Sequence, residues 1–227
     1  MPPAHPRPAA RVLVVDDETL IRSGFRFVLG NDPTIEVIGE AADGETAVAL
    51  VRAHRPDVTL MDVRMPGMGG IEATSQIVQQ SSTRVLAMTS MGSEGQLIRM
   101  LMAGASGYLL KDESPARIVD AVHRTAQGET VVSGRSTAQL VRRAVESEGG
   151  AGRAPAVKRL QVLTPREHEI AAAVAGGGTN QEIGLALHIS AGTVKAHLEQ
   201  VFAKLGVRNR VQVGILFERA GLGPADI

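Results

Sequence analysis

The sequence predicts an α/β domain built on a doubly wound, five-stranded parallel sheet, followed by a small all-α domain of four helices. In the first half, short apolar runs alternate with segments of helical periodicity, as in successive βαβ units. In the second half, apolar residues recur only at helical spacing. The 227 residues are enough for two small domains, each with a core of its own.

The first domain is expected to cover residues 11–130, after a proline-rich segment at residues 1–10 that we expect to be disordered. Apolar runs at residues 11–15, 58–61, 85–88 and 107–110 are too short for helices and predict strands buried on both faces. After the first run, a helix is predicted from the spacing of Leu20, Ile21, Gly24, Phe25, Val28 and Leu29. With the intervening segments, the pattern fits five strands and five helices.

Residues 131–159 predict a linker with a basic helix. Residues 130–159 contain 6 basic and 2 acidic side chains, whereas residues 1–129 contain 12 and 16, and residues 160–227 contain 6 and 6. A last helical stretch is expected at residues 137–145, and the Gly-rich sequence at residues 146–155 is expected to be flexible coil. The acidic first domain and the basic linker therefore account for a net charge of zero.

The second domain, residues 160–227, opens with a helix start signal. Thr164 is placed to cap the helix, Pro165 takes the first helical position, and Glu167 lies three residues after Thr164. This helix is expected to end at the glycines of residues 176–178, and a second helix opens at Thr179. After a break at residues 188–191, a third helix covers residues 192–205. Two short helices joined by a tight turn form a helix-turn-helix pattern.

Polar side chains stand at the C-terminal ends of four predicted strands. Asp16 and Asp17 follow the first run, Asp62 the next, and Thr89 and Lys111 the last two. Parallel α/β sheets place ligand sites at this edge, so these side chains are expected to meet. Three adjacent carboxylates repel one another unless a cation joins them, and oxygen ligands suit Mg²⁺ or Mn²⁺. A hydroxyl and an ammonium beside the metal would bind a phosphoryl group, so the ordered set predicts a phosphate-accepting carboxylate.

The stretch from residue 11 to residue 111 resembles the receiver domain of two-component response regulators, which has a flavodoxin-like fold. The resemblance is carried by Val-Leu-Val-Val-Asp-Asp-Glu at residues 12–18 and Asp-Val-Arg-Met-Pro-Gly-Met-Gly-Gly at residues 62–70. Met-Thr-Ser at residues 88–90 and Gly-Ala-Ser-Gly-Tyr-Leu-Leu-Lys-Asp at residues 104–112 complete it. These sequences span the whole first half of the chain.

This resemblance implies a role for each polar residue. Asp62 is the implied phosphoacceptor, and the implied metal ligands are the side chains of Asp16, Asp17 and Asp62 with the backbone carbonyl of Arg64. Thr89 and Lys111 would bind the phosphoryl oxygens. Tyr108, the only tyrosine in the chain, would be a switch residue that changes rotamer when Thr89 moves toward the phosphate.

Helical periodicity also separates two faces of the third helix of the second domain. The predicted buried stripe consists of Val194, Leu198, Val201 and Leu205, with Phe202 at its edge. The opposite face is small and polar enough to enter a major groove. Residues 190–212 contain four basic side chains and one acidic one, a charge that could also be an ordinary solvated face. The predicted DNA-binding residues are Thr193, Lys195, Ala196, Glu199, Gln200, Lys204, Arg208 and Arg210.

The second half resembles the LuxR-type helix-turn-helix of the NarL/FixJ response regulators. The shared sequences are Leu-Thr-Pro-Arg-Glu at residues 163–167, Thr-Asn-Gln-Glu-Ile at 179–183, Ile-Ser-Ala-Gly-Thr-Val-Lys-Ala-His at 189–197 and Lys-Leu-Gly-Val-Arg-Asn-Arg at 204–210. The resemblance implies that Lys195, Ala196 and Glu199 face the bases and that the helix from Asn209 onward supports dimerisation. Many family members carry a basic or small residue at the position of Glu199. A carboxylate is repelled by phosphate but accepts from cytosine N4, so Glu199 either reads a cytosine or turns aside.

Together the two resemblances imply a response regulator in which a sensor histidine kinase phosphorylates Asp62 and thereby controls transcription. The phosphorylated form is expected to be a homodimer on double-stranded DNA with inverted half-sites, with RNA polymerase as a further candidate partner. Phosphotransfer to its own aspartate and slow autodephosphorylation are the only reactions expected of it. The sequence has no cysteine, no signal peptide and no apolar run long enough for a membrane span, so a cytoplasmic location without membrane partners is expected.

Two alternatives remain open. A haloacid-dehalogenase-like phosphatase also places a nucleophilic Asp after a strand, but it typically has a second Asp two residues later, where this chain has Arg64. A phosphorylation-independent DNA-binding regulator would use a receiver-like domain only for dimerisation, and the intact Asp16, Asp17 and Asp62 argue against it. Rapid, slow or absent turnover of phosphate on Asp62 distinguishes the three functions.

Overall fold

The computed structural model describes residues 9–90, 94–132, 141, 145 and 153–222. These residues form two compact units, one ending at Val132 and the other beginning at Val141. Residues 1–8, most of the linker helix predicted at 137–145, and the first part of the predicted coil, 146–152, lie outside the described residues.

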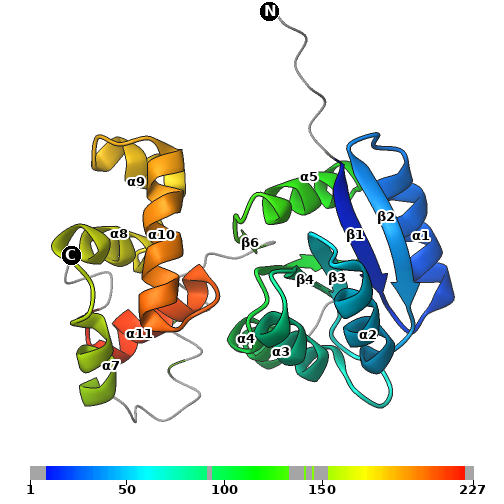
Figure 1. Cartoon of the computed structure of the whole chain (residues 1–227), viewed down its shortest axis with the longest axis horizontal. Helices are drawn as coiled ribbons and strands as arrows, with labels where there is room; N and C mark the ends of the chain where they lie inside the picture. Colours follow the sequence, from blue (N-terminus) through cyan, green and yellow to red (C-terminus); the bar gives the residue numbers. More distant parts are fainter. Residues whose placement is uncertain (1–8, 91–93, 133–140, 142–144, 146–152, 223–227) are drawn as a thin grey trace, which may run out of the picture. The chain divides into compact units, whose positions relative to one another are not determined.

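The first unit is a parallel sheet in the order β2-β1-β3-β4-β5-β6 with helices on both faces (Figure 1). Its strands are β1 (Ala10–Val15), β2 (Ile35–Ala41), β3 (Val58–Asp62), β4 (Arg84–Thr89), β5 (Gly107–Leu110) and β6 (Val131–Val132). Its helices are α1 (Thr19–Gly30), α2 (Gly44–His54), α3 (Gly70–Gln80), α4 (Glu94–Ala103) and α5 (Pro115–Ala126). The predicted doubly wound sheet is confirmed, and the two-residue strand β6, too short to show any periodicity, is an addition to the five expected strands.

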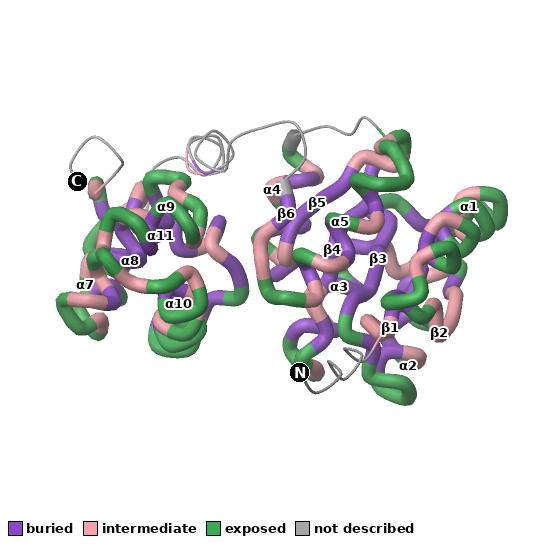
Figure 2. Tube along the Cα trace, turned by 90° about the horizontal axis from the view of Figure 1, so that it is seen from above, coloured by how far each residue is buried: buried purple, intermediate pink, exposed green. Residues whose placement is uncertain are grey.

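The central strands are buried on both faces, which is why they read as continuous apolar runs (Figure 2). Alternate residues such as Val12, Val14, Leu60 and Met88 pack with the apolar sides of α1 and α5. Helix α3 contacts both α2 and α4. Because β1 lies between β2 and β3, the winding direction reverses there, and the C-terminal ends of β1 and β3 flank the opening at which such sheets bind ligands.

The start of α3 lies directly against the end of β3. A Cβ atom on Gly70 would stand 1.8 Å from the carbonyl oxygen of Asp62 and 3.2 Å from Cγ of Met61. Only a residue without a side chain allows this approach. Gly70 therefore sets the position of the loop that leaves Asp62.

In the second unit, residues 153–222 form helices joined by short turns. They are α7 (Arg153–Leu160), α8 (Pro165–Ala175), α9 (Asn180–Ala186), α10 (Ala191–Leu205) and α11 (Arg210–Ala220). The four helices predicted from the sequence are α8 to α11. Helix α7 begins where coil was expected, because Ala156 and Leu160, four residues apart, are buried in the core of this unit.

The helix starts of the second unit follow the expected capping chemistry. Thr164 and Glu167 form a reciprocal capping box at α8, and Thr179 and Glu182 form a second one at α9. At α10 the hydroxyl of Ser190 accepts from the backbone N–H of Thr193. The predicted stripe of α10 is confirmed as buried: Val194, Leu198, Val201 and Leu205. The caps thus fix where the two helices of the helix-turn-helix begin.

The contact between Gly70 and Asp62 predicts that Gly70→Ala destabilises the first unit by about 1–3 kcal/mol, the usual cost of forcing an atom into a packed site. Chemical denaturation of the full chain, followed by circular dichroism, measures the change. The matched control is Gly24→Ala in α1, where nothing lies within 4 Å of the added Cβ. That change is expected to stabilise the helix by about 0.5–1 kcal/mol. Equal effects of the two substitutions would contradict the assignment.

Candidate functional site

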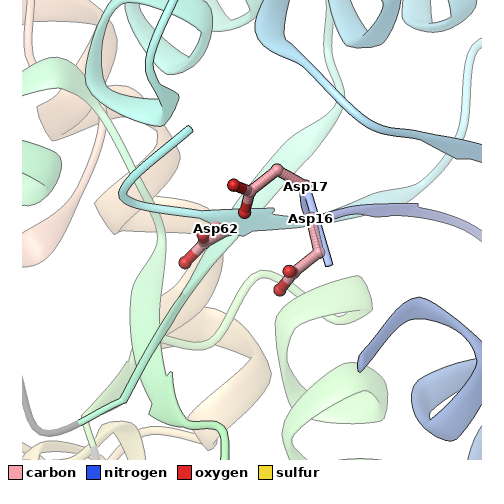
Figure 3. A group of neighbouring side chains, drawn as sticks. All are labelled: Asp16, Asp17 and Asp62. Carbon is pink, nitrogen blue, oxygen red and sulfur yellow. The ribbon is translucent and has the colours of Figure 1, made fainter. Parts of the chain in front are cut away.

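Three carboxylates meet at the C-terminal ends of β1 and β3 (Figure 3). Asp16 and Asp17 follow β1, and Asp62 is the last residue of β3. One oxygen of each side chain lies within 4.8 Å of those of the other two. Asp16 and Asp62 are buried, whereas Asp17 is exposed. The structure therefore brings the predicted acidic residues together, with one of them open to solvent.

Lys111, which follows β5, bridges the two buried carboxylates. Its Nζ atom lies 2.6 Å from Oδ2 of Asp16 and 3.1 Å from Oδ1 of Asp62. Burial alone would lower the pKa of this ammonium group, but the bonds to Asp16 and the charge of Asp62 outweigh that effect and raise the pKa. Lys111 therefore stays charged and holds together two groups that would otherwise repel each other.

Asp62 occupies an environment in which a negative charge is only partly compensated. Burial raises the pKa of its carboxyl group, the charge and hydrogen bond of Lys111 oppose the rise, and Asp16 adds to it. Its Oδ1 atom also accepts a hydrogen bond of 2.8 Å from the backbone N–H of Val63. The carboxylate is thus fixed in orientation, and Lys111 compensates its negative charge only in part. A further cation at this position would therefore be favourable.

Thr89 and Tyr108 lie on β4 and β5, the two strands that follow β3 in the sheet. Thr89, the last residue of β4, is buried, and its carbonyl accepts a 2.9 Å hydrogen bond from the backbone N–H of Lys111. Its hydroxyl donates a long 3.5 Å bond to the carbonyl of Ser90. Tyr108 of β5 pairs with Ala87, and its burial raises the pKa of the phenol. The switch function of Thr89 and Tyr108 remains a prediction.

Arg22 was not predicted from the sequence, although it positions Asp16. Its Nη1 atom donates a 2.7 Å hydrogen bond to the carbonyl of Asp16, and its Nε atom lies 3.4 Å from Glu40. Oδ1 of Asp16 in turn accepts from the backbone N–H of Glu18 at 3.0 Å. A cation in the first turns of a helix is electrostatically unfavourable. The position of Arg22 near the start of α1 was the signal that could have identified it.

The donor set fits a divalent ion that prefers oxygen ligands. Asp16, Asp17 and Asp62 offer carboxylate oxygens, and the exposed side of Asp17 leaves room for retained water. A bound Mg²⁺ or Mn²⁺ would also compensate the repulsion between the buried carboxylates. Arg64, whose carbonyl was predicted as a further ligand, lies two residues after Asp62 with its side chain exposed. That carbonyl ligand remains a prediction.

Most of the predicted DNA-binding residues lie on one side of α10, whereas Arg208 follows this helix and Arg210 begins α11. The exposed residues of α10 are Gly192, Thr193, Ala196, Glu199, Gln200, Ala203 and Lys204, and Lys195 is partly exposed. The opposite side of the helix is the buried stripe described above. An exposed helix carrying small and polar side chains has the shape and chemistry that a major groove accepts.

Two of the cations predicted to reach phosphates are bound within the unit. Nζ of Lys204 lies 2.7 Å from Oε2 of Glu167, and the guanidinium of Arg210 donates to the carbonyl of Gly178. Glu167 is buried and also accepts from the backbone N–H of Thr164 at 2.8 Å, so it closes the cap of α8 as well. The bonds to Lys204 and Thr164 lower the pKa of Glu167 to about 2. Arg208, in contrast, is exposed.

Helix α11 is buried over most of its length. Val213, Leu216, Phe217 and Ala220 belong to the core of the second unit. On another side, a Cβ atom on Gly214 would stand 2.7 Å from Cγ2 of Val141. A second copy of the chain could reach Gly214 only after Val141 had moved. Dimerisation through this helix therefore remains a prediction.

Comparison with known proteins agrees with this arrangement of two units. Residues 12–123 match the response regulator receiver domain, and residues 161–217 match the bacterial regulatory proteins of the luxR family. The transcriptional regulatory protein LiaR of Bacillus subtilis is 39% identical over 210 residues, which cover 92% of this chain and 97% of LiaR. The chain belongs to the NarL/FixJ family of two-component response regulators. Its function is therefore the control of transcription by a two-component system.

Other members of this response regulator family are similar over nearly the same length. The nitrate/nitrite response regulator NarL of Escherichia coli K12 is 34% identical over 207 residues, 91% of this chain and 94% of NarL. The crystal structure of the response regulator ChrA, from a haem-sensing two-component system, has a TM-score of 0.50 and 31% identity, covering 94% of this chain and 98% of ChrA. Receiver domains bind Mg²⁺ at an acidic cluster, and the cluster of Asp16, Asp17 and Asp62 is of this kind.

Within the described part of the regulator, no helix has the length and apolarity needed to cross a lipid bilayer.

The raised pKa of Asp62 predicts that Asp62→Asn raises the thermal unfolding midpoint of the receiver at neutral pH without divalent ions. A group whose pKa is raised by folding favours the folded state at low pH, and that contribution is lost as the pH rises through the folded pKa. Asparagine removes the unfavourable charge, while Lys111 keeps its bond to Asp16. Differential scanning fluorimetry in EDTA measures the midpoint. The exposed Glu36→Gln is the control, and a midpoint that falls in Asp62→Asn would contradict this account of the charges.

The lowered pKa of Glu167 predicts that removing its charge destabilises the second unit, the opposite of the effect expected for Asp62 in the first unit. A carboxyl whose pKa is lowered by folding stabilises the folded state above its ordinary value of 4.5, and this stabilisation is lost as the pH falls toward about 2. Glu167→Gln is therefore expected to destabilise the unit at pH 6, and the difference from wild type is expected to shrink between pH 4.5 and pH 2. Urea denaturation at several pH values tests this, with the exposed Glu169→Gln as control. A difference that is independent of pH would contradict the role of the Glu167 charge.

Proposed function

We propose that a sensor histidine kinase transfers a phosphoryl group to Asp62 and that this modification controls binding of the second unit to DNA. The observation that carries the proposal is the bridge from Lys111 to Asp16 and Asp62 at the end of β3. It supports an acceptor carboxylate that is buried, fixed in orientation and flanked by a permanent positive charge. Family membership supports a histidine kinase as the phosphoryl donor.

The transfer is a substitution at phosphorus. An oxygen of Asp62 forms a bond to the phosphorus of a phosphohistidine, the P–N bond breaks, and its electron pair returns to the imidazole of the kinase. Oδ1 of Asp62 is already an acceptor for Val63 and Lys111, which favours Oδ2 as the attacking oxygen. The product is an acyl phosphate on Asp62. Phosphotransfer and slow autodephosphorylation at this residue belong to the same proposal.

The residues around Asp62 then respond to the new charge. Lys111 is placed to follow the phosphoryl oxygens, because its ammonium already lies 3.1 Å from Asp62. The hydroxyl of Thr89, whose single bond to a described residue is the long one to Ser90, would turn toward them. Tyr108 would then occupy the space that it leaves. Mg²⁺ or Mn²⁺, held by Asp16, Asp17, Asp62 and the Arg64 carbonyl, would neutralise negative charge on the phosphoryl group during transfer.

On the second unit, we propose that α10 enters the major groove. Thr193, Lys195, Ala196, Glu199 and Gln200 would face the bases, and the positive charges that would approach the phosphates are Lys204, Arg208 and Arg210. Lys204 and Arg210 would contribute while bound to Glu167 and Gly178, because each has further N–H donors. Arg208 is the exposed member of the three.

Phosphorylation would favour a homodimer, because a single small module makes few phosphate contacts and gains affinity when two are linked. A symmetric dimer predicts inverted half-sites about one DNA turn apart. RNA polymerase would be the further partner at a promoter, and the whole process places the protein in the cytoplasm.

The proposal predicts that the full chain, incubated with Mg²⁺ and acetyl phosphate, gains the mass of one phosphoryl group and shifts toward a dimer. Intact-mass spectrometry and analytical ultracentrifugation on the same sample measure both changes. Asp62→Asn keeps the shape of the side chain but cannot form the acyl phosphate, so it is expected to gain no mass and to remain unshifted.

The other functions give different results in the same experiment. An adduct on both wild type and Asp62→Asn would place the acceptor elsewhere. Rapid release of phosphate over many turnovers would indicate a phosphatase that uses an aspartyl-phosphate intermediate. No adduct with acetyl phosphate or with a phosphorylated histidine kinase would indicate a regulator that binds DNA without phosphorylation.

A further inference from the structure

The free face of α10 has a regular arrangement that concerns the choice of DNA sequence. Projected at about 100° per residue, the small residues Gly192, Ala196 and Ala203 lie along the centre of this face. Glu199 stands on one side of this ridge and Gln200 on the other, and both are exposed. Small side chains at the centre allow the helix backbone to come close to the groove floor. The longer side chains beside the ridge then reach the base edges.

The carboxylate of Glu199 is exposed on α10. Among the described residues it forms no ion pair and no side-chain hydrogen bond. Lys204, the cation at the end of the same helix, is bound to Glu167 instead. Lys195 lies four residues before Glu199 on the same side of the ridge, but the two side chains form no ion pair. The carboxylate of Glu199 is therefore open to solvent and available to a ligand. The carboxylate of Glu167, in contrast, is bonded to Lys204.

The chemistry of the groove restricts what this carboxylate can bind. Guanine presents the acceptors N7 and O6, thymine presents O4 and a methyl group, and adenine places the acceptor N7 beside its amino group. A carboxylate has acceptors only, so it is repelled by each of these acceptor atoms. Cytosine presents its N4 amino group as a donor at the major-groove edge. Lys195 on the same side supplies positive charge that offsets the repulsion between Glu199 and nearby phosphates.

We propose that Glu199 is a specificity-determining residue that accepts a hydrogen bond from the N4 amino group of a cytosine in each half-site. The inference rests on the proposed function, because it requires that α10 enter the major groove. It assigns to this regulator a preference for a C·G pair at one position, set by a residue that contributes no attraction to phosphates.

The test uses the full chain, phosphorylated with acetyl phosphate and Mg²⁺. Preferred sites are first selected from random duplexes, and each base pair of the selected site is then replaced in turn. At one C·G pair per half-site, replacing the cytosine is expected to weaken wild-type binding by roughly 10- to 100-fold. Placing 2-pyrimidinone, which lacks the N4 amino group, at that cytosine is expected to weaken binding similarly. Fluorescence anisotropy at fixed salt measures the affinities.

Two substitutions of Glu199 and one control complete the experiment. Glu199→Ala is expected to lose the preference at that position and to bind the cytosine and 2-pyrimidinone duplexes equally. Glu199→Gln is expected to shift the preference toward adenine, since an amide can pair with both N6 and N7. Glu169→Ala removes an equal charge from the exposed surface of α8 and is expected to retain the wild-type preference.

The unfavourable outcomes are distinguishable. If Glu199→Ala keeps the same preference for cytosine and the same penalty for 2-pyrimidinone, the assignment of Glu199 is wrong while the proposed DNA binding stands. If the phosphorylated wild type selects no sequence at all, the DNA-binding proposal fails, and the inference fails with it.

Discussion

The compensation of buried negative charge at the ends of β1 and β3 is the constraint on which the first unit depends. Asp16 and Asp62 are removed from water and lie close together, an arrangement that costs free energy unless a cation joins them. Lys111 supplies that cation, with 2.6 Å and 3.1 Å contacts to the two carboxylates. The parallel sheet makes this possible because it brings the C-terminal ends of β1, β3 and β5 to one edge. The compensation is incomplete, and a site that is short of positive charge is suited to a divalent ion and to the chemistry of phosphoryl transfer.

The surrounding residues hold this charged group rather than react with it. Arg22 fixes the backbone of Asp16 through its carbonyl, the N–H of Val63 fixes Oδ1 of Asp62, and Gly70 allows α3 to begin against the same residue. Thr89 is the exception, since among the described residues its hydroxyl makes a single long bond. A fixed carboxylate next to one loosely held hydroxyl is the arrangement expected of a site whose neighbours rearrange when charge is added. The geometry thus separates the groups that hold Asp62 in place from a hydroxyl that is loosely held.

In the second unit, charged residues divide into two classes by their contacts. Glu167 and Glu182 close capping boxes, and Glu167 also holds Lys204, so these charges maintain the positions of α8, α9 and α10. Glu199 is exposed on α10, and Arg208 is exposed just beyond its end. Helix termini contribute to this division, because the first backbone N–H groups of each helix need acceptors, which the side chains of Glu167 and Glu182 help to provide through their capping boxes. The exposed side chains of α10, such as Glu199 and Gln200, are then available to bind a ligand.

Local sequence determined most of the elements of this protein. The apolar runs of β1, β3, β4 and β5, the capping signal at Thr164 and the stripe of α10 depend on residues no more than a few positions apart, and all were predicted. The ordered set of Asp16, Asp17, Asp62, Thr89 and Lys111 was predicted as well, because parallel strands must deliver their C-terminal residues to one edge. Strand β6 and helix α7 were missed, since a two-residue strand has no period and α7 is defined by the burial of Ala156 and Leu160 in the core. Only the tertiary structure decided which charged side chains form ion pairs within the protein. Lys204 looked free for phosphate, yet it is bonded to Glu167, 37 residues away in the sequence, and no local pattern records a contact between side chains that folding brings together.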